Sequence, residues 1–116
     1  MKPLIFVTFF LSFLISGPVR SAPLQGVERV FAAENHVCAR VVGGATVCWG
    51  LNFAGELGDG NRITSPFPVA VAGLGGVASG IDGGVGFTCA ATTAGSAKCW
   101  GANEYGQLGN GSTGFE

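Results

Sequence analysis

The sequence predicts an all-β protein built from repeated units of short strands. Glycine supplies 21 of the 116 residues, which excludes a bundle of long helices because each interior glycine costs a helix about 1 kcal/mol relative to alanine. Hydrophobic residues make up 47% of the chain and charged residues 11%, whereas disordered chains are poor in apolar residues and rich in charge. The third observation is an internal repeat with an offset of 51 residues.

Nine residues define this repeat, because each of them recurs 51 positions later. In the first copy they are Cys38, Cys48, Trp49, Gly50, Asn52, Gly55, Leu57, Gly58 and Gly60, and in the second copy Cys89, Cys99, Trp100, Gly101, Asn103, Gly106, Leu108, Gly109 and Gly111. Nine coincidences at one offset indicate two copies of one structural unit. The sequence therefore predicts a first unit over residues 22–73 and a second, incomplete unit over residues 74–116.

Residues 1–21 are predicted to be a secretory signal peptide. Lys2 precedes an uncharged apolar run at residues 4–16, Pro18 follows the run, and cleavage is expected after Ser21. A helix of this run spans about 20 Å, less than the hydrocarbon core of about 30 Å, which disfavours a transmembrane helix. An uncleaved anchor or lipoprotein-like leader is the alternative, and it would be the one contact of the chain with a membrane.

Within each unit the pattern predicts short antiparallel strands. They are expected at residues 27–31, 37–41, 46–49 and 67–71 of the first unit and at residues 77–81, 88–92 and 97–100 of the second. Residues 27–42 lack glycine and would suit a helix by pattern alone. Their counterpart contains four glycines between positions 80 and 86, so a helix is excluded for both copies. Four short strands in about fifty residues is the spacing of a β-propeller blade.

The cysteines are predicted to form two disulfides, Cys38–Cys48 and Cys89–Cys99. In each copy the two cysteines lie symmetrically about a three-residue loop whose third residue is Gly44 or Gly95, as in a type I turn with a glycine bulge. That register places each pair directly opposite, with Cα atoms about 4.5–5.5 Å apart, which a disulfide accepts. Free buried cysteines and a four-cysteine zinc site are the alternatives, but zinc sites prefer a shorter ligand spacing.

The repeated stretches at residues 48–60 and 99–111, and the run at residues 65–74, resemble the signature of the regulator of chromosome condensation repeat family. The resemblance covers residues 24–116, and the paired cysteines are similar to those of extracytoplasmic members. It implies a seven-bladed β-propeller, of which this chain would supply about two four-stranded blades. The founding member of the family is a nucleotide exchange factor for a small nuclear GTPase and binds chromatin, and a secreted member inhibits β-lactamases.

Two features depart from the family pattern. The chain holds fewer than two repeats where a closed ring needs about seven, so either the natural protein continues past Glu116 or, if the chain is complete, several copies assemble into a homo-oligomer. The histidine that the family often has before the first cysteine is present as His36, but Phe87 stands at its counterpart.

The repeated motif residues are expected to be structural. The glycines would allow tight turns with positive φ, and Asn52 and Asn103 would cap their own loops through Asx-type hydrogen bonds. The tryptophans and leucines would pack between blades. Asn110 begins a glycosylation sequon, but Asn-Gly is first a turn dipeptide that matches Asp59-Gly60, and this explanation suffices.

The sequence predicts no catalytic residue, no cofactor site and no metal site, so the protein is not expected to be an enzyme. His36 is the single histidine, and a structural role is expected for it. Glu56, Asp59, Asp82 and Glu104 are dispersed and are expected to be solvated loop carboxylates. The glycine run at residues 80–86 lacks the lysine of a phosphate-binding loop.

The leader and the cysteines indicate a role outside the cytoplasm, and the charge bears on the kind of partner. Beyond the leader, four basic and seven acidic residues give a net charge of −3 without a basic cluster, which disfavours nucleic acid as a partner. The expected function is a non-enzymatic, secreted or periplasmic module that binds or scaffolds an unknown protein partner. Guanine nucleotide exchange, as in the founding member, is the alternative, although a secretory leader separates the chain from a cytosolic GTPase. A third possibility is an enzyme whose active residues lie in further blades.

Overall fold

The computed structural model describes residues 24–113, and the predicted signal peptide lies outside them. The described residues form seven strands: β1 (Val27–Ala32), β2 (His36–Val41), β3 (Thr46–Gly50), β4 (Ser65–Ala70), β5 (Ala78–Gly83), β6 (Phe87–Thr92) and β7 (Ala97–Gly101). Over the described part of the chain, the structure has no helix of the length and apolar character needed to cross a membrane.

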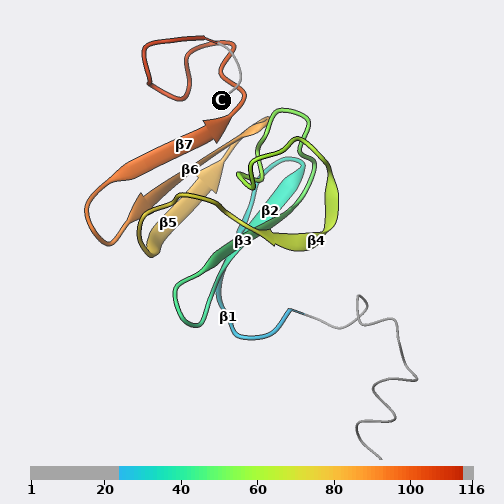
Figure 1. The fold of residues 1–116 in the computed structure, drawn as a ribbon, viewed down its shortest axis with the longest axis vertical. Helices are drawn as coiled ribbons and strands as arrows, with labels where there is room; N and C mark the ends of the chain where they lie inside the picture. Colours follow the sequence, from blue (N-terminus) through green and yellow to red (C-terminus); the bar gives the residue numbers. More distant parts are fainter. Residues whose placement is uncertain (1–23, 114–116) are drawn as a thin grey trace, which may run out of the picture.

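The strands form two antiparallel sheets, one for each unit of the repeat (Figure 1). The first sheet has the order β1-β2-β3-β4, and the second has the order β5-β6-β7. The all-β fold class is therefore confirmed, and the strand ends differ from the predicted ones by one or two residues. The fourth strand begins at Ser65 instead of residue 67, so that it includes Pro66 and Pro68. Both prolines are tolerated because β4 is the edge of its sheet.

Both predicted disulfides, Cys38–Cys48 and Cys89–Cys99, are present. In each hairpin the two cysteines are directly opposed. Their Cα atoms are 4.0 Å apart in both pairs, closer than the expected 4.5–5.5 Å. In the first hairpin the backbone hydrogen bonds join Val41 N to Ala45 O and Leu51 N to Asn35 O, which places the cysteines at a non-hydrogen-bonded pair. Side chains of such pairs lie closest together.

The turn of the first hairpin differs from its prediction. Gly44 and Gly95 both have positive φ, at +92° and +90°, as the bulge requires. However, Gly43 also has positive φ, at +96°, and this excludes a type I turn because the third turn residue of that type has negative φ. A positive φ at that position is typical of a type II turn. Its counterpart Ala94 is not in the positive-φ region, because a Cβ atom makes that conformation costly.

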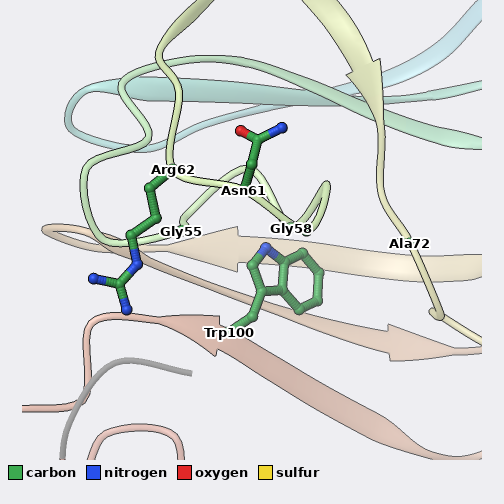
Figure 2. Close-up of a pocket in the computed structure, with 7 residues that line it drawn as sticks. Gly55, Gly58, Asn61, Arg62, Ala72 and Trp100 are labelled. Carbon is green, nitrogen blue, oxygen red and sulfur yellow. The ribbon is translucent and has the colours of Figure 1, made fainter.

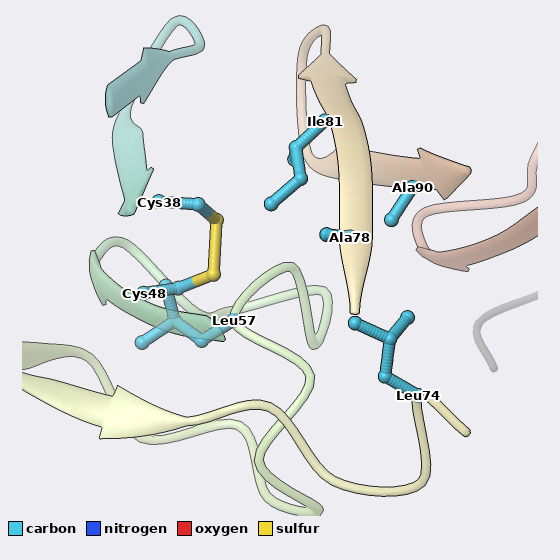
Figure 3. Close-up of a cluster of buried hydrophobic side chains, with 7 residues drawn as sticks. All are labelled: Cys38, Cys48, Leu57, Leu74, Ala78, Ile81 and Ala90. Atoms are coloured by element: carbon cyan, nitrogen blue, oxygen red, sulfur yellow. A yellow bond between two sulfur atoms is a disulfide. The ribbon is translucent and has the colours of Figure 1, made fainter. Parts of the chain in front are cut away.

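The hydrophobic core lies between the two units (Figure 3). Its buried members come from both sheets and from the connections after β3 and β4: Cys38, Cys48, Leu57, Leu74, Ala78, Ile81 and Ala90. The Cys38–Cys48 disulfide lies beside Leu57 and opposite Ile81 of the second unit. Trp100 and Phe31 pack against the edge of this cluster. The two sheets are therefore joined by shared apolar burial as well as by the chain.

Candidate functional site: the unit contact and the motif loops

One buried asparagine organises each motif loop. Asn52 is fully buried; its Oδ1 accepts a hydrogen bond from Leu57 N at 2.9 Å, and its Nδ2 donates to Asn61 O at 3.0 Å. Asn103 repeats this arrangement, with Leu108 N as donor and Ser112 O as acceptor, both at 2.9 Å. The bonds reach five to eleven residues along the chain, so the asparagines tie whole loops together and do more than cap a local turn.

The motif glycines adopt the positive φ angles that were expected for them. All eight have positive φ: Gly50, Gly55, Gly58, Gly60, Gly101, Gly106, Gly109 and Gly111. Gly58 also has a packing role, because a Cβ atom at this position would lie 2.7 Å from Nε1 of Trp100. A side chain here would therefore push the second unit away from the first.

The backbone carbonyl of Glu56 is the polar centre of the contact between the units. Trp100 Nε1 donates to it at 2.9 Å, and Thr88 Oγ1 donates to it at 2.8 Å. Thr88 is 1% exposed, so this contact is shielded from water. Two side chains of the second unit thus bind one carbonyl in the motif loop of the first.

His36 extends this junction from the other side. Its Nε2 lies 2.6 Å from Thr88 Oγ1. Because Thr88 gives its one hydroxyl hydrogen to Glu56, the hydroxyl must accept a hydrogen from Nε2. A neutral His36 therefore carries its proton on Nε2, and its Nδ1 is a buried acceptor with no hydrogen-bond partner among the described residues.

The surroundings of His36 favour this neutral form. Burial lowers the pKa of His36 below its usual value of 6.5, and the charge of Glu56 opposes that shift. His36 is 3% exposed and its one hydrogen-bonded nitrogen contacts Thr88. The histidine joins the two units, and the Thr88 hydroxyl beside it is buried and gives its hydrogen to the Glu56 carbonyl.

The prediction of a solvated carboxylate is wrong for Glu56. Its side chain is 1% exposed, and Oε1 accepts a hydrogen bond from Ala54 N at 2.8 Å. The carboxylate thus folds back onto its own loop while the second unit covers the loop from outside. Asp82 and Glu104 are exposed and Asp59 is half-buried, so the structure does not pair these acids as general acid and base.

A pocket of about 350 Å³ lies between the first motif loop and the second unit (Figure 2). Its lining consists of Gly55, Gly58, Gly60, Asn61, Arg62, Ala72 and Trp100. The Trp100 indole forms one wall, and the Arg62 side chain lies at one side. The lining brings together no catalytic pair, and within residues 24–113 no group of His, Cys, Asp and Glu side chains is arranged to hold a metal ion.

Four large apolar side chains are exposed in loops at one end of the strands. They are Phe53 (72% exposed), Ile63 (70%), Val85 (68%) and Tyr105 (90%). The loops after β3, between β5 and β6, and after β7 carry them, and the two motif loops lie at the upper end in Figure 1. We call these four residues the loop face.

Sequence reasoning did not identify the loop face. The available signal was the difference between the two copies, since Phe53 corresponds to Glu104 and Tyr105 corresponds to Ala54. A position that holds different residues in the two copies is not constrained by the packing that both copies share. A large apolar residue at such a position is therefore a candidate for contact with a partner.

The described fold matches known proteins. Residues 78–107 match the family model described as the regulator of chromosome condensation (RCC1) repeat. The structure is similar to human WBSCR16, with a TM-score of 0.68 and 22% identity, covering 78% of this chain and 23% of that one. It is also similar to yeast RCC1 (Prp20) in its complex with Kap60, with a TM-score of 0.67 and 18% identity, covering 82% of this chain and 24% of that one.

A further structural match is Prp20p from Saccharomyces cerevisiae, described with its binding to Gsp1p and histones. Its TM-score is 0.56 and its identity 27%, over 68% of this chain and 19% of that one. The chain thus spans about a quarter or less of the length of these proteins. The family model covers most of the second unit, and the first unit repeats the same motif at one constant offset. The two sheets have the fold of β-propeller blades, and residues 78–107 match the repeat of the regulator of chromosome condensation family.

Proposed function

We propose that the protein is a non-enzymatic module that binds a protein partner outside the cytoplasm, and that the loop face is its binding surface. The observation that carries this proposal is the exposure of Phe53, Ile63, Val85 and Tyr105 at one end of the strands, between 68% and 90%. Clustered exposed apolar side chains are typical of interaction sites. Aromatic residues are enriched among the residues that contribute most binding energy.

The two motif loops, which carry Phe53, Ile63 and Tyr105, are held in place before any partner arrives. Asn52 and Asn103 bond to both the early and the late part of their loops. Binding by an ordered loop avoids much of the entropic cost of ordering it at the interface. Two neighbouring preorganised loops are a favourable platform for a protein surface.

The compartment is supported by the disulfides and by the leader sequence. Disulfides are retained in oxidising compartments, and both pairs of cysteines are bonded here. The apolar run at residues 4–16 with its small residues up to Ser21 has the pattern of a secretory signal. A nucleotide exchange activity rests on the family resemblance alone, and no feature of the described residues favours it.

The test places a photo-crosslinkable aromatic residue at the position of Tyr105 in the full chain, produced in its source organism. The control places the same residue at Val42, which is 69% exposed in the turn between β2 and β3 at the opposite end of the strands. We expect an adduct with a different protein from the Tyr105 position, recovered from the extracytoplasmic fraction, and none from the Val42 position. Equal adducts at both positions, or recovery only from the cytoplasm, would refute the proposal.

A further inference from the structure

The pocket between the first motif loop and the second unit has one wall whose orientation is fixed (Figure 2). This wall is the Trp100 indole, whose Nε1 donates to the Glu56 carbonyl at 2.9 Å and whose ring packs over Gly58. Because both contacts hold the ring, a ligand does not have to order it. The volume of about 350 Å³ falls in the range of ligand pockets, about 300–1,000 Å³. We call it the indole pocket.

Two of the four basic residues beyond the predicted leader lie at this pocket. Arg62 lines it. Lys98 stands two residues before Trp100 on β7, so both side chains leave the same face of the strand. Its Nζ donates to Gly73 O at 2.7 Å, and Gly73 directly follows Ala72, which lines the pocket. The pocket therefore has a positively charged rim, although the net charge beyond the leader is −3.

Neither of these cations belongs to the repeated motif. Thr113 stands at the counterpart of Arg62, and Val47 stands at the counterpart of Lys98. The fold of the unit therefore does not require a positive charge at either position. Two cations beside one pocket, both outside the shared packing, favour an anionic group as the ligand.

The acidic side chains of the same loop are bound within the loop. Asp59 lies between two of the lining glycines, and its Oδ1 accepts a hydrogen bond from Asn52 Nδ2 at 3.2 Å. The Glu56 carboxylate folds back onto Ala54 N. Neither acid belongs to the lining, so an anion at Arg62 meets no acidic side chain of the pocket wall.

We propose that the indole pocket binds an acidic side chain, glutamate or aspartate, of the protein partner. The carboxylate pairs with the Arg62 guanidinium, whose fork of N–H donors matches its two oxygens. The aliphatic stem packs on the Trp100 indole, which buries apolar surface, and Lys98 adds a second positive charge at the rim. This inference rests on the proposed binding of a protein at the loop face, and it names the chemistry of one partner residue.

The indole pocket adjoins the loop face along the chain. Arg62 immediately precedes Ile63, and Trp100 lies at the end of β7, just before the loop that carries Tyr105. Arg62 and Ala72 are both exposed. A partner seated on the loop face can therefore place an acidic side chain in the pocket while it contacts Ile63.

The first test titrates the full chain with butyrate, which has the carboxylate and the aliphatic stem of glutamate, and with butyramide, its neutral analogue. The readout is the NMR signal of the indole N–H groups, because the chain has two tryptophans and Trp49 serves as an internal reference. We expect a saturable shift of the Trp100 signal, with butyrate binding about tenfold more tightly than butyramide, since hydrogen bonds to charged groups are the stronger ones. Equal binding of both probes, equal shifts of both indoles or the absence of a shift would overturn the proposal.

The variant Arg62→Gln assigns the preference for butyrate to one side chain. It should remove this preference, whereas Arg29→Gln should keep it, because Arg29 is exposed on β1 and its loss changes the net charge equally. An unchanged Trp100 signal of Arg62→Gln without probe shows that the pocket is intact. If that signal has moved, Arg62→Lys replaces the variant, and it should bind butyrate more weakly than the wild type and more tightly than it binds butyramide. A preference that survives Arg62→Gln, or the absence of any preference in Arg62→Lys, counts against the assigned contact.

The second test uses the partner recovered by crosslinking from the Tyr105 position. Arg62→Gln should weaken its affinity about tenfold, and Arg29→Gln should leave it unchanged. A crosslinker at Ala72 should label the partner next to an aspartate or glutamate, and neutralising that residue should cause no further loss in combination with Arg62→Gln.

The outcomes separate this inference from the proposed function. If Tyr105→Ala weakens binding and Arg62→Gln does not, the loop face is the binding surface and the assignment of the indole pocket is wrong, even if butyrate binds there. If no partner is recovered, the proposed function fails and this inference fails with it, whatever the butyrate titration shows.

Discussion

Replacing Thr88 with valine tests the junction between the two units. The substitution keeps the shape of the side chain and removes the hydroxyl that accepts from His36 Nε2 and donates to the Glu56 carbonyl. The Glu56 carbonyl keeps the hydrogen bond from Trp100 Nε1, so the loss of its second donor, the Thr88 hydroxyl, costs little. The imidazole N–H is left buried without a partner, and a buried unpaired polar group costs about 1–3 kcal/mol. When the losses at the carbonyl and at the imidazole are combined, we expect the free energy of unfolding to fall by about 2–3 kcal/mol.

The assay is equilibrium unfolding of the full chain in urea, with Thr93→Val as the matched control. Thr93 is exposed, and substitutions at such positions change stability by less than about 0.5 kcal/mol. His36→Phe combined with Thr88→Val should recover part of the loss, because the pair becomes apolar on both sides. A non-additivity of about 1 kcal/mol or more is expected from residues in contact. If Thr88→Val unfolds like Thr93→Val, or if the double variant is simply additive, the junction does not work as described.

Three further predictions concern the same contact. Because the pKa of His36 is lowered in the folded state, its stabilising contribution is complete above the unfolded-state value of 6.5 and is lost as the pH falls below it; urea midpoints measured from neutral to acidic pH should show this slope, and His36→Gln should remove it. Gly58→Ala should destabilise the chain by about 1–3 kcal/mol more than Gly60→Ala in the same assay, since only Gly58 faces Trp100, and equal effects would contradict the close packing. Cys99 is half-buried whereas Cys48 is fully buried, so under mild reduction timed alkylation should label the Cys89–Cys99 pair first, and the reverse order would be inconsistent with the placement of the core.

The sequence alone predicted those features that depend on local chemistry repeated in both copies. The disulfide pairing followed from the symmetry of cysteines about a loop that ends in Gly44 or Gly95, and the structure contains both pairs. The β fold of residues 27–42 followed from the glycines of the second copy. In both cases the second copy resolved an ambiguity that one copy left open.

Features that depend on contacts between the units were not predictable in this way. Glu56 is a loop carboxylate by its sequence, and it is buried because its side chain turns back to Ala54 N while Trp100 covers its carbonyl. His36 and Thr88 are 52 residues apart, and no local pattern pairs them. The turn at Gly43 was mistaken because two adjacent glycines permit several turn types, whereas Ala94 permits fewer.

The loop face was missed for a related reason. Recurrence in both copies selects residues that hold the fold. Phe53 and Tyr105 occur once each at their positions. Their exposure depends on the closed conformation of the loops around Asn52 and Asn103, which recurrence alone does not indicate.

The measurement that tests the proposed role most directly is the affinity of the full chain for the partner recovered by crosslinking, compared between Tyr105→Ala, Phe53→Ala and Val42→Ala. Val42 is as exposed as Phe53, at 69% against 72%, but lies at the other end of the strands. Because truncation of an aromatic anchor at an interface costs about 2 kcal/mol or more, we expect each loop-face variant to lose affinity about thirtyfold, and Val42→Ala to bind like the wild type. Unchanged affinity in both loop-face variants, or equal losses in all three, would contradict binding through the loop face.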